Sequence, residues 1–177
     1  MCGIIGYLGN KQAAPILIDG LKKMEYRGYD SAGVAVMQKG KVQCVKKAGK
    51  ISNLEKELPK VNLDGTVGIA HTRWATHGAP TDNNAHPHWD CQSKLYILHN
   101  GIIENFPALK KQLLKEGHKI RTETDTEILV HLIEKYYKKN VKLEDAVQKA
   151  LHKVEGTYGI AVISSSEPKK IVAARLG

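Results

Sequence analysis

The chain has 177 residues, of which 42% are hydrophobic and 25% charged, a composition typical of one soluble globular domain with a sizeable core. No stretch approaches the roughly 18 consecutive apolar residues of a membrane span, so we expect no membrane partner. The net charge of +9 raises the hypothesis that the protein binds nucleic acid. However, the lysines are scattered and only 6% of residues are aromatic, so we expect solvated faces and no nucleic-acid partner.

The first stretch, Met1-Cys2-Gly3-Ile4-Ile5-Gly6, predicts a buried strand that begins with a nucleophilic side chain. If Met1 is removed, Cys2 carries both a thiol and a free α-amine. The reference pKa of an α-amine is about 7.7–8.0, so part of it is an unprotonated base near neutral pH. Such a base can activate the adjacent thiol without a histidine. An ordinary strand with an incidental cysteine is the alternative interpretation.

The rest of the first half alternates helical and strand patterns. Its apolar spacing predicts a helix over Ala13–Met24, and its glycines and polar residues predict a shaped loop over 25–33. The pattern then predicts a hairpin of strands 34–37 and 42–46 turning at Lys39-Gly40, and a short helix over 51–58.

The second half follows the same logic. Two apolar runs predict buried strands over 67–70 and 95–98, and Thr124 with Glu127 predicts a capped helix start. Further patterns predict helices over 106–116 and 143–154 and strands over 157–163 and 171–174. The chain ends at Arg175-Leu176-Gly177 without a polar tail, as we expect of a piece of a longer protein.

Polar residues follow the predicted strands or begin the predicted helices, where sites are usually built. After the strand over 95–98, the amide of Asn100 and the N–H of Gly101 could donate to an oxyanion; a hairpin turn is the usual alternative for Asn-Gly. Arg73 offers a planar fork for a carboxylate. Asp125 is stable in the first turn of a helix, where capping is its alternative role.

The three cysteines, Cys2, Cys44 and Cys91, cannot all pair, and their spacing is not that of a disulfide scaffold. We therefore expect reduced thiols and a cytoplasmic location. A histidine-rich stretch, 86–91, with His71, His77 and His99 elsewhere, raises the alternative of a metal-binding domain. Its spacing matches no closed structural zinc pattern, so we expect no metal and no other cofactor.

Long stretches of the chain resemble the class II glutamine amidotransferases, whose catalytic cysteine is N-terminal. The matching stretches are Cys2-Gly3-Ile4-Ile5-Gly6, Glu25 to Gly33, His71 to Gly78, Asn84 to His88, His99 to Asn105 and Glu123 to Glu127. They resemble the sugar-phosphate branch more closely than the branches of purine or asparagine synthesis. The resemblance implies an α+β fold of four layers, with two antiparallel sheets stacked between helical layers in the manner of N-terminal-nucleophile hydrolases.

The resemblance also implies a role for each matching residue. Cys2 would be the nucleophile and its α-amine the base, while Asn100 and Gly101 would hold the oxyanion. Arg73 would bind the α-carboxylate of glutamine and Asp125 its α-ammonium. The remaining implied residues surround the substrate: Trp74, Thr76 and His77 on a covering loop, and Arg27 and His86 at the entrance or facing another domain.

The resemblance finally implies what the whole protein does. Glutamine would be hydrolysed to glutamate and ammonia, and a C-terminal sugar-phosphate isomerase domain, absent from this chain, would use the ammonia to convert fructose 6-phosphate to glucosamine 6-phosphate. The full-length protein would be a homo-oligomer. The residues 1–177 would form the glutaminase domain alone.

Overall fold

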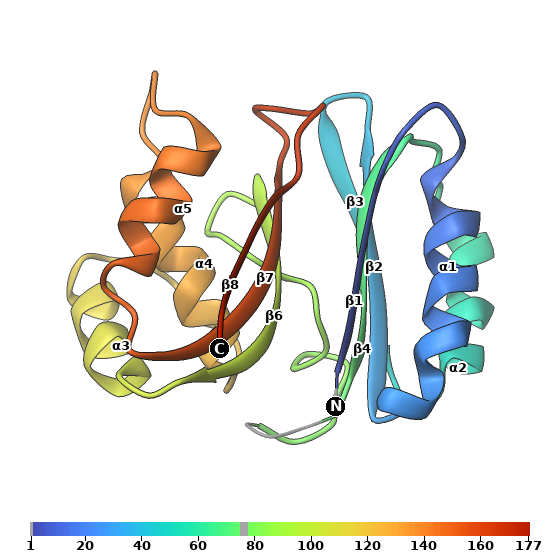
Figure 1. Ribbon diagram of the computed structural model, residues 1–177, viewed down its shortest axis with the longest axis horizontal. Helices are drawn as coiled ribbons and strands as arrows, with labels where there is room; N and C mark the ends of the chain where they lie inside the picture. Colours follow the sequence, from blue (N-terminus) through green and yellow to red (C-terminus); the bar gives the residue numbers. More distant parts are fainter. Residues whose placement is uncertain (1, 75–77) are drawn as a thin grey trace.

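A computed structural model of the chain describes residues 2–74 and 78–177, with Arg27 described by its backbone alone. The described part forms four layers, helices–sheet–sheet–helices (Figure 1). Helices α1 (Ala13–Met24) and α2 (Ile51–Glu57) cover one sheet. Helices α3 (Phe106–Lys115), α4 (Asp125–Tyr136) and α5 (Leu143–Leu151) cover the other. The expected α+β sandwich is confirmed.

Both sheets are antiparallel and four-stranded in the described residues, with orders β1-β4-β2-β3 and β5-β6-β7-β8. Short 3₁₀ turns follow α1 and α2 at Glu25–Arg27 and Leu58–Lys60. The strands are β1 (Gly3–Leu8), β2 (Ser31–Gln38), β3 (Lys41–Ala48), β4 (Val67–Arg73), β5 (His88–Trp89), β6 (Leu95–Ile103), β7 (Gly156–Ser164) and β8 (Val172–Leu176).

The continuous apolar runs of the central strands follow from this layering, because both faces of each sheet are covered. Along β2, Val34 and Val36 pack under α1, while the alternate residues Ala35 and Met37 face the second sheet. Successive side chains of a strand point to opposite faces. A strand between two apolar layers therefore needs apolar residues at successive positions, and not only at every second one.

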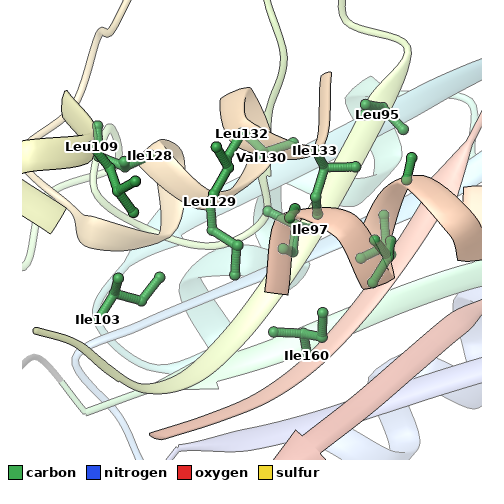
Figure 2. Close-up of a cluster of buried hydrophobic side chains, with 14 of the residues drawn as sticks. Leu95, Ile97, Ile103, Leu109, Ile128, Leu129, Val130, Leu132, Ile133 and Ile160 are labelled. Carbon is green, nitrogen blue, oxygen red and sulfur yellow. The ribbon is translucent and has the colours of Figure 1, made fainter. Parts of the chain in front are cut away.

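The second sheet packs against α4 in the same way. Figure 2 shows Ile97 of β6 and Ile160 of β7 within the cluster that also holds Leu129 and Ile133 of α4. All four side chains are at most 3% exposed. This packing fixes α4, and with it the position of Asp125 in its first turn.

The predicted helix over 13–24 is confirmed, but several predicted boundaries are wrong. Strand β2 begins at Ser31, inside the predicted loop, and β4 and β6 continue to Arg73 and Ile103. Polar residues stay in these strands because neighbouring strands pair with them, as in the pairing of Asn100 with Gly159. Helix α5 ends at Leu151, three residues before the predicted end.

Helix α4 begins as predicted, with the Thr124 hydroxyl accepting from Glu127 N at 3.3 Å. The reciprocal half of the capping box does not form, because the Glu127 carboxylate accepts from the N–H groups of Arg121 and Thr122 instead. Among the described residues, no helix has the length and apolarity needed to cross a membrane.

Candidate functional site

The thiol of Cys2 lies against the end of β4. Pairing of β1 with β4 places Gly3 opposite Thr72, and Gly3 N donates to Thr72 Oγ1 at 3.2 Å. One residue beyond β4, the main-chain N of Trp74 donates to Cys2 Sγ at 3.1 Å. The sheet therefore holds the sulfur in place, with its residue half-buried.

The amide of Asn100 joins the two sheets beside this thiol. Its Nδ2 donates to the main-chain oxygen of Cys2 at 3.1 Å, and its Oδ1 lies 2.8 Å from His71 Nε2. Burial lowers the pKa of His71 to about 4, so the ring is neutral at neutral pH. The contact then requires Nε2 to carry the proton, and both ends of the amide are fixed.

Gly101 occupies a backbone conformation that requires glycine. Its φ is +132°, and a Cβ at this position would lie 2.1 Å from Thr157 O. Asn100 and Gly101 lie within β6, paired with Gly159 and Tyr158 of β7. The alternative of a hairpin turn at Asn-Gly is therefore wrong.

Arg73 and Asp125 bring opposite charges to the same region. Their residues are 4% and 5% exposed. Burial lowers the pKa of the Arg73 guanidinium, while the charges of Cys2, Asp125 and Asp30 act in the opposite direction. Asp125 is anchored by its Oδ2, which accepts from Ile103 N at 3.0 Å and so ties α4 to the end of β6.

The loop before β2 packs on the residues beside Cys2. Asp30 N donates to Arg73 O at 3.1 Å, and a Cβ at Gly28 would lie 2.8 Å from the Arg73 carbonyl carbon. The Tyr29 ring meets the Trp74 ring edge-on at 5.6 Å. Trp74 is 46% exposed, which places its side chain at the surface next to the thiol.

Some predicted site residues are not tested or are placed differently. Thr76, His77 and Met1 lie outside the described residues, as does the side chain of Arg27. His86 is 5% exposed, and its role at the entrance or facing another domain stays a prediction. A polar contact holds the buried ring of His86: its Nε2 lies 2.9 Å from Thr126 Oγ1, at the start of α4.

A buried group of histidines backs the site, and sequence reasoning did not assign it there. The rings of His71 and His86 stack at 4.3 Å, and His88 Nε2 lies 3.1 Å from Thr124 Oγ1. The alternation of side chains along a strand could have indicated His71, because it lies two residues before Arg73 and shares a face of β4 with it. No comparable local pattern points to Thr72 or Thr126.

The other two thiols lie away from this group. All three cysteines are free. Cys44 lies in β3, where burial raises the pKa of its thiol to about 12 and makes it unreactive. Cys91 does not join His86 or His88, as the histidine-rich stretch suggested; its sulfur lies 3.6 Å from His131 Nδ1.

Comparison with known proteins agrees with this arrangement. A family described as a glutamine amidotransferase domain matches residues 71–176. The glutamine–fructose-6-phosphate aminotransferase (isomerizing) of Chlorobaculum tepidum is 56% identical over 182 residues, covering 100% of this chain and 30% of that protein. The protein of the same name from Pyrococcus horikoshii is 50% identical, with 99% and 29% covered.

Solved structures give the same result. Glutamine phosphoribosylpyrophosphate amidotransferase from B. subtilis, complexed with ADP and GMP, has a TM-score of 0.80 at 26% identity, over 99% of this chain and 37% of that one. A structure of the allosteric regulatory enzyme of purine biosynthesis has a TM-score of 0.84, also at 26% identity, with 99% and 37% covered. The chain thus spans about 30% of the length of the curated relatives it matches. It belongs to the glutamine amidotransferase domain family of enzymes and has their N-terminal-nucleophile hydrolase fold.

Proposed function

We propose that this chain hydrolyses L-glutamine to glutamate and ammonia, with Cys2 as the nucleophile. The observation that carries the proposal is the contact of Asn100 Nδ2 with Cys2 O at 3.1 Å. It places an amide donor beside the residue that carries the thiol, as acyl transfer through an oxyanion requires. No separate base is needed, because removal of Met1 frees the α-amine of Cys2.

The chemistry proceeds in two halves. The Cys2 thiol gives its proton to the α-amine, and the sulfur bonds to the side-chain carbonyl carbon of glutamine. Asn100 and Gly101 N–H stabilise the resulting oxyanion. The amine passes the proton to the leaving nitrogen, the carbon–nitrogen bond breaks, and ammonia departs. Water then attacks the thioester, gives a proton back to the sulfur through the amine, and releases glutamate.

Charge and burial support a role for Arg73 and Asp125 in binding the amino-acid end of glutamine. A guanidinium forms paired hydrogen bonds with a carboxylate, and the Asp125 carboxylate suits an ammonium group. Their burial at 4% and 5% exposure strengthens both interactions relative to water. We further propose that Trp74, Thr76 and His77 lie on a segment that covers the bound substrate.

The curated relatives support a proposal for the whole protein. Their name describes an aminotransferase that acts on glutamine and fructose 6-phosphate. We propose that a C-terminal isomerase domain uses the ammonia to make glucosamine 6-phosphate, in a cytoplasmic homo-oligomer. The 177 residues would then supply the glutaminase domain.

The test is incubation of the purified chain with glutamine, followed by measurement of glutamate and ammonia. We expect both products in equal amounts, and neither from Cys2→Ala. We also expect no amino sugar on adding fructose 6-phosphate, and no stimulation by it. Hydrolysis that persists in Cys2→Ala would overturn the assignment of the nucleophile.

A further inference from the structure

Four ligand-type side chains meet beside α4, two of them from its second half. They are Cys91, His118, His131 and Glu134, and their ligand atoms all lie within 4.8 Å of one another. The Cys91 sulfur lies 3.6 Å from His131 Nδ1 and 3.9 Å from His118 Nδ1. Glu134 Oε2 lies 2.9 Å from His118 Nδ1 and 3.0 Å from His131 Nδ1.

These separations are close to the edges of a small tetrahedron, two of them shorter and one longer. Bond lengths of about 2.0–2.3 Å from zinc to nitrogen, oxygen and sulfur imply ligand–ligand distances of roughly 3.3–3.6 Å. The four measured distances lie on both sides of that range. Side-chain adjustment within this cluster, whose ligand atoms all lie within 4.8 Å of one another, would bring the four atoms to bonding distance of one ion.

The surroundings of His131 resemble the support that metal-binding histidines receive. Its Nδ1 points into the cluster, and its Nε2 lies 3.5 Å from Glu127 Oε1. Glu127 is itself held by the N–H groups of Arg121 and Thr122. With an ion bound at Nδ1, the Glu127 carboxylate would face the N–H at Nε2, as carboxylates commonly do beside metal-binding histidines.

Charge points the same way. His131 has an exposed side-chain fraction of 0% and stands between the carboxylates of Glu127 and Glu134, whose side chains are 2% and 14% exposed. A divalent ion would balance the negative charges of Glu134 and of a Cys91 thiolate.

The ion also has a route to the cluster. His118 and Glu134 line a surface cavity of about 660 Å³, bordered by Asp90, Lys94 and the segment 137–142. The two side chains are 13% and 14% exposed.

We propose that Cys91, His118, His131 and Glu134 form a structural site for one Zn²⁺. A set of one sulfur, two imidazole nitrogens and one carboxylate oxygen suits zinc, and four protein ligands leave no open position for catalysis. The site joins three segments: the turn after β5, the segment between α3 and α4, and the last turns of α4. It would thereby hold the helix whose first turn carries Asp125.

The experiment is a titration of chelator-treated protein with Co²⁺, which takes the place of Zn²⁺ and absorbs light. The full chain carries Cys2→Ala, because an N-terminal thiol beside an amine would bind metal by itself. We expect one equivalent of Co²⁺ to produce the thiolate-to-cobalt charge-transfer absorption, Zn²⁺ to displace it, and Zn²⁺ to raise the melting temperature.

Matched variants distinguish the site from chance binding. Cys91→Ser should abolish the absorption, whereas Cys44→Ser should keep it. His118→Asn should weaken Co²⁺ binding at least about tenfold, whereas His152→Asn, at an exposed position after α5, should not. Circular dichroism checks that each variant is folded. A folded parent without saturable absorption, or an unchanged titration in both Cys91→Ser and His118→Asn, would overturn the proposal.

Discussion

The side-chain amide of Asn100 donates to the main-chain oxygen of Cys2 at 3.1 Å across 98 residues of sequence. Asn100 lies in β6, and Cys2 directly precedes β1 of the other sheet, so this contact crosses the interface between the layers. The same amide accepts from His71 on the strand next to β1. Formation of the site therefore depends on correct stacking of the sheets.

Replacing Asn100 by Ala should slow catalysis more than it weakens binding. Removal of one oxyanion donor costs about 10²–10³-fold in kcat in a measured case, so we expect a loss of that order with a smaller change in KM. Steady-state glutaminase assays measure both. Asn105→Ala, which removes an amide contact with Lys153 O at the surface, is the control. Equal kcat for the two variants would contradict the role of Asn100.

Gly101→Ala should destabilise the fold. The new Cβ would lie 2.1 Å from Thr157 O, in a backbone conformation with φ of +132°. Strain of this kind costs about 1–3 kcal/mol, and the contact adds to it. Gly117→Ala is the matched control, because φ is +88° there but nothing lies within 4 Å of the Cβ. Urea denaturation should show the larger loss for Gly101→Ala; the reverse order would count against this description of β6.

Arg73→Lys and Asp125→Asn should both raise the KM for glutamine. The first keeps the charge but loses the paired donors, and the second can still accept from Ile103 N while losing its charge. Removing one partner of a buried charge contact costs about 2–5 kcal/mol, so we expect an increase of at least about thirtyfold for Asp125→Asn and a smaller one for Arg73→Lys. Calorimetry on a Cys2→Ala background measures binding directly. Normal affinity for glutamine in both variants would show that the α-carboxylate and α-ammonium groups of glutamine bind elsewhere.

Acid should destabilise the fold between about pH 6.5 and 4.5. Burial lowers the pKa of His71 to about 4 and holds those of His86 and His88 well below 6.5. The unfolded chain then binds more protons in this window, so the free energy of unfolding falls as the pH falls. The pKa of His131 is raised instead, so the protonation of this residue changes the free energy of unfolding only above about pH 6.5.

Denaturation midpoints at pH 7 and pH 5 measure this effect. His88→Gln keeps a polar partner for Thr124 Oγ1 and should reduce the difference between the two midpoints. A difference as large as that of the parent chain would show that His88 already protonates in the folded state.

The sequence predicts this fold well where local signals are strong. Helix α1 has the predicted bounds, and Thr124 caps α4 as expected. The strand ends are less predictable, because Arg73 and Asn100 stay in strands through pairing with distant segments. Local polarity alone would end those strands earlier, and it did so in the predicted boundaries.

The residues of the candidate sites also differ in how far the sequence predicts them. Residues within a local motif, such as Gly101 in Asn-Gly, could be predicted from the chain itself. The partners of Cys91 could not, because His118 and His131 reach it from segments 27 and 40 residues away. The contact of His86 with Thr126 could not be predicted for a similar reason, since only the packed structure brings Thr126 to its ring.

The central claim is that Cys2 is the nucleophile that attacks glutamine. Reaction of the chain with an electrophilic glutamine analogue, followed by peptide mass spectrometry, tests it most directly. We predict one label, on Cys2, in molecules that have lost Met1, with Cys44 and Cys91 unmodified and hydrolysis lost in proportion to labelling. A label on Cys91, or full labelling of molecules that retain Met1, would contradict the account.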